Sequence, residues 1–237
     1  MKKKADNDFG FSDLPIEVIR SGRRKTISIR VSHGRVEVRV PHATPDRRIV
    51  ELLLKKRPWI DEKLLQQSGQ VAPVRGYQTG DSFEVLGRQV TLHWVSDQVK
   101  RVYLQGDDLV VHVPARVVQR QRYVKRAIEG WFRDQTLANV GAVIDHYGPL
   151  AGVAPTAIKA RRYKARWGSC NHRGELSFNW LIPVAPQTIV DYVVVHELCH
   201  LRHMNHSQAF WACVEALLPD YRQRRQWLRC NGWRLVV

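Results

Sequence analysis

The His-Glu-x-x-His motif at residues 196–200 constrains the fold more than any other part of the chain. On a helix, residues four apart lie on one face about 6 Å apart along the axis, so two imidazoles can bind one cation. In a strand the same two residues would lie about 13 Å apart and could not bind together. The β-branched run 189–195 favours a strand by propensity alone. Metal binding requires a helix instead, and Pro186 near its first turn agrees with a helix start.

Glu197, the residue after the first histidine, is the candidate general base. A glutamate at this place on the helix reaches a metal-bound water rather than the metal. Zinc held by three imidazoles keeps an open position and lowers the pKa of its water toward about 7. We therefore expect hydrolysis of a peptide bond, with a non-peptide amide as an alternative. Tyr163, Arg166 and Tyr192 are candidates for a second oxyanion donor, and the sequence does not distinguish them.

A third metal ligand has three candidates. His203 shares the helical face of the first two histidines, but on a straight helix it lies about 10 Å along the axis from His196. His206 follows His200 by six residues, a spacing that works when the helix ends and the chain folds back. Glu215 would come from a following helix. The spacing favours His206, and the other two remain alternatives.

The first half of the chain contains a weak internal repeat. Residues 36–41 match residues 109–114 at an offset of 73, and each is an alternating strand that ends in proline. A basic helical stretch follows each of them. We therefore expect two copies of a strand–strand–helix unit, at 16–65 and 83–145, joined by a Gln-, Gly- and Pro-rich linker at 66–80. The later stretch 175–181 also alternates, and we interpret it as the sheet edge to which an extended peptide substrate would add.

The chain is strongly basic, with 38 Lys and Arg against 22 Asp and Glu, a net charge of +16. This charge favours nucleic acid or another acidic partner. The alternative function is therefore a basic nucleic-acid-binding protein whose zinc site is structural or vestigial. The presence of Glu197 argues against it, because a structural site is closed and has no base beside an open position. DNA contacts are expected from the helices of the repeat and from the basic residues Lys159, Arg161, Arg162, Lys164 and Arg166.

Composition narrows the class of protein. With 44% hydrophobic and 25% charged residues, the chain has a globular composition. It has no apolar run of membrane-spanning length, and its basic start lacks the apolar stretch of a secretory signal. The four cysteines form no Cys-x-x-Cys pair, which argues against a disulfide framework or an all-cysteine zinc site. We expect a cytoplasmic protein that does not bind membranes, and no feature indicates its oligomeric state.

Residues 192–211 carry a family resemblance. Their His-Glu-Leu-x-His-Leu sequence, followed by Asn-His-Ser-x-x-Phe-Trp, resembles the YgjP-like metallopeptidase family, which is related to the SprT-like and WLM zincins. Residues 166–170 and 176–180 are similar to further blocks of that family, and the likeness covers most of residues 15–233. The resemblance implies zinc (Zn2+) bound by His196, His200 and His206, with Glu197 as the general base. It also fits a protease that acts on DNA-bound proteins, as SprT-like relatives do.

These observations together predict an α+β fold with three parts. Residues 1–14 are expected to form a flexible tail, and residues 15–145 a β-rich N-terminal region with the two repeated units. Residues 146–237 are expected to form a zincin-like metallopeptidase domain that contains the His-Glu-x-x-His helix.

Overall fold

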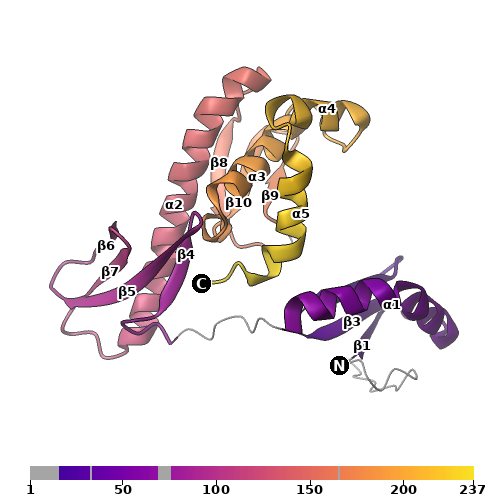
Figure 1. The fold of residues 1–237 in the computed structure, drawn as a ribbon, viewed down its shortest axis with the longest axis horizontal. Coiled ribbons are helices and arrows are strands. Elements are labelled where there is room, and N and C mark those ends of the chain that lie inside the picture. The colour runs from indigo at the N-terminus through magenta and orange to yellow at the C-terminus, as the bar shows by residue number, and fades with distance from the viewer. Residues whose placement is uncertain (1–15, 33, 69–75, 165) are drawn as a thin grey trace. The chain divides into compact units, whose positions relative to one another are not determined.

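The computed structural model describes residues 16–237 except 33, 69–75 and 165 (Figure 1). The expected flexible tail, residues 1–14, and the middle of the expected linker lie outside the described residues. The chain divides into two compact units, Met1–Val74 and Arg75–Val237. The structure is α+β, as expected, with helices and mixed sheets in both units.

The smaller unit is a three-stranded sheet with one helix. Its elements are β1 (Ile16–Ser21), β2 (Ser28–Ser32), β3 (Arg35–Pro41) and α1 (Asp46–Ser68). The sheet order is β1-β3-β2, with β1 parallel and β2 antiparallel to β3. Alternation along β3 places Val36, Val38 and Val40 in a fully buried row, in the same core as Ile49 and Leu53 of α1. One face of the sheet therefore carries the core of this unit.

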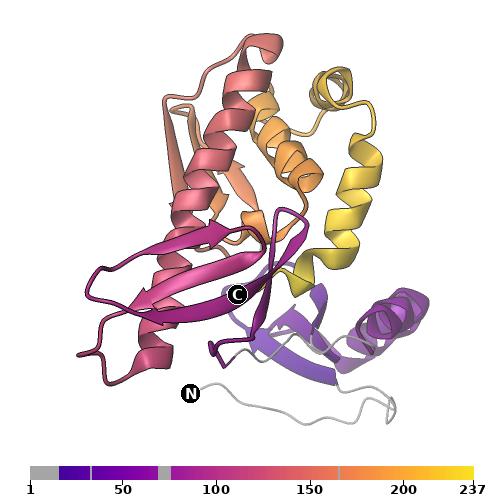
Figure 2. The same cartoon turned by 60° about the vertical axis from the view of Figure 1, so that its left-hand side comes forward.

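The larger unit begins with a four-stranded sheet in the order β4-β5-β7-β6. Its strands are β4 (Ser82–Val85), β5 (Arg88–Ser96), β6 (Val102–Gln105) and β7 (Asp108–Val113). Helix α2 (Arg120–Ala151) follows, and the sheet crosses its N-terminal half (Figure 2). Leu92 and Leu109 of the sheet and Ile128 and Phe132 of α2 are fully buried in the same core. This core joins the sheet to the first half of the helix.

The same strand arrangement occurs in both units. Strands β5 and β7 are parallel and β6 is antiparallel to β7, just as β1 and β3 are parallel and β2 is antiparallel to β3. A helix follows in each case. The prediction of two strands before each helix was wrong, because each helix follows three strands of this pattern. The edge strands β2 and β6 are short and have no buried residue.

The expected boundary between residues 145 and 146 is also wrong. It falls inside α2, a helix of 32 residues that contributes to two cores. The first half of α2 packs with the four-stranded sheet, and Val140, Val143 and Ile144 in its second half pack with the helices that follow. A continuous helix shared by both cores makes one compact unit of residues 75–237.

The rest of the larger unit combines a small sheet with three helices. Its elements are β8 (Ala157–Arg161), β9 (Gly168–Cys170), β10 (Glu175–Asn179), the 3-10 turn η1 (Ile182–Val184), α3 (Gln187–His200), α4 (Gln208–Leu217), α5 (Tyr221–Asn231) and the 3-10 turn η2 (Gly232–Arg234). The sheet order is β8-β10-β9. Strand β10 is therefore central, paired with β8 on one side and β9 on the other, so the expectation that 175–181 forms an edge was wrong. Strand β9 is the edge that contacts α3.

A search of the described helices found none with both the length and the apolar content needed to cross a lipid bilayer.

Candidate metal centre

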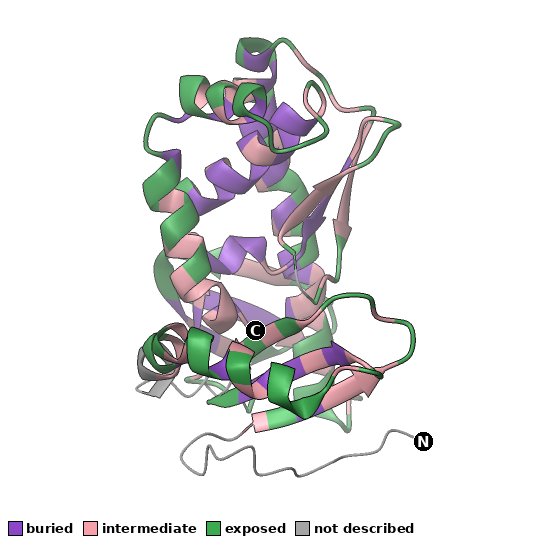
Figure 3. Ribbon diagram, turned by 90° about the vertical axis from the view of Figure 1, so that its right-hand side faces the viewer, coloured by how far each residue is buried: buried purple, intermediate pink, exposed green. Residues whose placement is uncertain are grey.

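Helix α3 carries His196, Glu197 and His200 through the centre of the larger unit. Most of its residues are buried, including the run 192–195, and Figure 3 shows this burial along the ribbon. A helix that is apolar on nearly every side is stabilised by packing, which outweighs the β propensity of its valines. Pro186 precedes its first residue, as the sequence predicted.

The chain turns back directly after α3. The backbone N–H groups of Leu201 and His203 donate to carbonyls of the last helical turn, and the side chain of Ser207 accepts from the N–H of Phe210 to cap α4. This turn brings His206 to His196, with their Nε2 atoms 3.0 Å apart. The possible ligand atoms of His196, His200 and His206 all lie within 4.8 Å of one another.

The other two candidate ligands are not part of this group. His203 contributes no ligand atom to it, although its carbonyl oxygen lies 2.9 Å from Nδ1 of His200. Glu215 forms an ion pair with Arg222, 3.2 Å away. Among the described residues, the structure therefore brings His206, and neither alternative, to the two histidines of the motif.

The protonation of the three histidines is compatible with metal binding. Because Nδ1 of His200 faces a carbonyl oxygen, that nitrogen carries the proton and Nε2 offers its lone pair. Burial, together with the neighbouring His200 and His206, lowers the pKa of His196 to about 3. Burial also lowers the pKa of His206, with a further contribution from His200. Neutral imidazole is the form that binds metal, and a set of three suits zinc or a similar transition metal.

One aromatic side chain packs against the rings of all three histidines. Phe210 is fully buried, and its ring centroid lies 4.9, 4.5 and 4.8 Å from those of His196, His200 and His206. Trp211 stacks on His206 at 5.6 Å and on Tyr221 at 5.4 Å. The first turn of α4 and the start of α5 thus fix the ring of the exposed third histidine.

Glu197 is 5% exposed, and burial raises its pKa to about 8 against the opposing charge of Arg166. Its Oε2 is buried and has no hydrogen-bond partner among the described residues. Gly168 of β9 lies directly against this carboxylate: a Cβ at residue 168 would be 2.6 Å from both Cγ and Oε1 of Glu197. Only glycine leaves room for the side chain in this position. The sequence suggested a turn here and gave no sign of this contact.

A cleft of about 210 Å³ opens beside Glu197. It is lined by Arg166, Trp167, Gly168, Tyr192, Val193, His196, Glu197 and Leu228. Tyr192 is 5% exposed, and burial raises its pKa to about 12, so its hydroxyl stays protonated at neutral pH. Tyr163 does not line the cleft, and its hydroxyl is hydrogen-bonded to Ser169 at 2.8 Å. Of the three expected oxyanion donors, the structure thus places Arg166 and Tyr192 at the cleft.

The basic residues expected to contact DNA differ in their exposure and in their partners. Lys159 forms an ion pair with Glu175 at 2.7 Å. Arg161, Arg162 and Lys164 are exposed, whereas Arg166 lines the cleft. The structure contains no nucleic acid, so these contacts stay a prediction.

Comparison with known proteins agrees with the geometry of the site. The model of the family described as YgjP-like, metallopeptidase domain, matches residues 25–231. No curated protein matches the chain. The crystal structure of the metallopeptidase zymogen of Pyrococcus abyssi abylysin matches with a TM-score of 0.36 and 20% sequence identity. The match covers 39% of this chain and 92% of the abylysin chain. Since the family model spans most of the sequence, the protein belongs to the YgjP-like family, and its matched region is a metallopeptidase domain.

Proposed function

We propose that this protein is a zinc-dependent metallopeptidase that uses Glu197 as its general base. The observation that carries the proposal is the convergence of His196, His200 and His206 beside a buried carboxylate that has no hydrogen-bond partner. Three imidazole donors and an adjacent base are the arrangement of a catalytic zinc site rather than a structural one. The exposure of His206 and the cleft beside Glu197 also support an accessible site.

Each group at the site has its own role in the proposed reaction. When bound, zinc supplies an open coordination position, Lewis acidity and a positive charge that favours the ionised form of Glu197. Glu197 accepts a proton from the attacking water and delivers it to the leaving amine. The hydroxyl of Tyr192, which stays protonated, donates a hydrogen bond to the developing oxyanion.

The substrate is proposed to bind along β9. Among the described residues this three-residue strand pairs only with β10, and it contacts α3, the helix of the motif. An extended peptide that adds to a sheet edge gains main-chain hydrogen bonds. A chain bound in this way passes through the site rather than ending in it, which favours an endopeptidase. This assignment replaces the earlier expectation for residues 175–181.

Metal content and cleavage of an unfolded protein substrate test the function together. Glu197→Gln should retain the metal of the wild-type protein and lose turnover, because an amide cannot accept the proton. A variant that cleaves the substrate at the wild-type rate would show that Glu197 is not the base. Wild-type protein that binds metal but cleaves no peptide bond would favour the alternative, a basic protein with a structural site. Retention on DNA that falls steeply with salt would support that alternative.

A further inference from the structure

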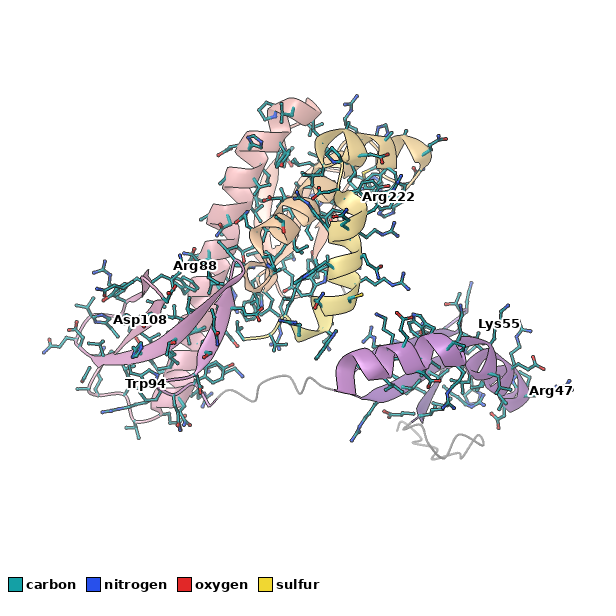
Figure 4. All side chains as sticks on the ribbon, viewed as in Figure 1. Arg47, Lys55, Arg88, Trp94, Asp108 and Arg222 are labelled. Carbon is teal, nitrogen blue, oxygen red and sulfur yellow. The ribbon has the colours of Figure 1, made fainter. Side chains whose placement is uncertain are left out.

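The cleft beside the metal centre is lined by one arginine, Arg166, and by one carboxylate, that of Glu197. Most carboxylates on the surrounding elements are already paired: Glu215 with Arg222 at 3.2 Å, and both Asp220 and Asp191 with Arg224 at 2.9 and 3.7 Å. Figure 4 shows Arg222 at the N-terminal end of α5, beside α4. Glu175 on the sheet is paired with Lys159. These pairs leave Glu197 as the acidic residue that lines the cleft.

Two arginines near the site have no carboxylate within ion-pair distance among the described residues, Arg166 and Arg225. Arg166 lines the cleft together with Glu197, and its guanidinium lies 5.5 Å above the ring of Tyr163. The guanidinium of Arg225 lies 4.6 Å above the ring of Trp211, the indole that stacks on His206. The two cations therefore come from different elements, the segment before β9 and helix α5, and both are exposed.

Both arginines lie close to the residues of the metal centre. Arg166 lines the same cleft as His196 and Glu197, and Arg225 packs on the indole that stacks on His206. A cation this close opposes the binding of a divalent metal by the same three imidazoles. Both guanidinium groups are exposed and accessible to an anion of the substrate, and the carboxylate that shares the cleft with Arg166 is the proposed base.

A guanidinium matches a carboxylate better than any other common peptide group, because its planar fork donates two parallel hydrogen bonds. The cleft of about 210 Å³ includes His196 and Glu197 in its lining, so a substrate group that contacts Arg166 there lies close to the reacting bond. We propose that Arg166 and Arg225 select peptides that carry a carboxylate close to the scissile bond. This inference rests on the proposed peptidase function. The carboxylate comes from an acidic side chain, as expected for an endopeptidase, or from the C-terminus of the substrate, in which case the enzyme would instead remove C-terminal residues. The two peptide series below distinguish these sources.

The test compares cleavage of matched fluorogenic peptides by the full-length, zinc-loaded protein. One series has Glu, Gln or Lys beside the scissile bond and an amidated C-terminus. A second series has no acidic side chain and either a free or an amidated C-terminus. Losing a hydrogen bond to a charged group lowers kcat/KM by roughly 10- to 100-fold, and we expect that preference for the Glu peptide over the Gln peptide, or for the free C-terminus over the amide. The series that shows the preference identifies the source.

Variants assign the preference to the two arginines. Arg166→Gln and Arg225→Gln should each reduce the preference, measured as the ratio of kcat/KM for the carboxylate peptide to that for its neutral counterpart, since a neutral side chain gains nothing from a guanidinium. Arg229→Gln is the matched control, because Arg229 is an exposed arginine one turn further along α5 and should leave the preference unchanged. Chelator competition gives a readout that does not depend on activity: Arg225→Gln should bind zinc more tightly than wild type.

The possible failures can be told apart. If the acidic, neutral and basic peptides are cleaved at equal rates, the selectivity is wrong and the peptidase function stands. If no peptide is cleaved, the proposed function fails, and the anisotropy of labelled peptides then tests recognition alone. In that case, tighter binding of a carboxylate peptide that is lost in both arginine variants supports the inference, and equal binding of all peptides overturns it.

Discussion

Gly168→Ala should remove most of the hydrolytic activity and leave the metal bound. A Cβ at residue 168 would lie 2.6 Å from both Cγ and Oε1 of Glu197 and 2.8 Å from its Cδ. Carbon atoms in contact are normally about 3.5 Å apart, so the carboxylate must move by about 1 Å. A misplacement of that size costs about 100-fold in rate. The three nearest atoms to the added Cβ all belong to Glu197, so the metal ligands should be spared.

The assay measures kcat on an unfolded protein substrate and zinc content of the same preparation. Gly141→Ala is the control, because nothing lies within 4 Å of a Cβ at that helical glycine and kcat should not change. A double-mutant cycle in urea unfolding then locates the cause. The destabilisation by Gly168→Ala should shrink when Glu197→Ala removes the atoms that the methyl group meets. A Gly168→Ala protein with wild-type kcat, or a cost in stability independent of residue 197, would refute the reasoning.

Three further predictions address the metal and its surroundings. His206→Ala should weaken zinc binding by more than the 10- to 100-fold typical of losing an outer-shell partner, as measured by chelator competition; unchanged affinity would remove His206 from the ligand set. Phe210→Leu should lower both stability and zinc affinity, whereas Phe132→Leu, which is equally buried but belongs to the other core, should lower stability alone. In metal-free protein, the neutral form of Glu197 is favoured by folding, so its stabilising contribution is complete below pH 4.5 and is lost as the pH rises through about 8. Glu197→Gln should therefore gain stability over wild type across that window, at most about 1.4 kcal/mol per pH unit, and a difference that does not vary with pH would contradict the burial of this carboxylate.

The candidate site was predictable where its residues are close in sequence. His196, His200 and His206 are related by one helix and one turn, so their spacing favoured His206 as the third ligand over His203 and Glu215. Gly168 and Arg225 come to the site from a distant strand and a distant helix. No local pattern marks either residue, because their roles depend on tertiary packing.

The fold, too, was predictable only where local sequence patterns determine it. The strands that end at Pro41 and Val113 and the helices after them were predicted from local patterns. The central place of β10 was not, because alternation reports which face of a strand is buried and says nothing about its neighbours. The domain boundary was misplaced for a related reason. Residues 120–151 form one helix that serves two cores, and the composition on either side of residue 145 does not reveal it.

The three imidazoles all belong to residues 196–206, so bringing them together closes only a short loop. Short loops lose little chain entropy on closure, and an unfolded chain therefore keeps much of its capacity to capture a divalent ion. Any affinity of the denatured ensemble for metal is subtracted from the stabilisation that the ion gives to the native state. Zinc should thus raise the melting temperature of this protein by less than its affinity for the folded form implies.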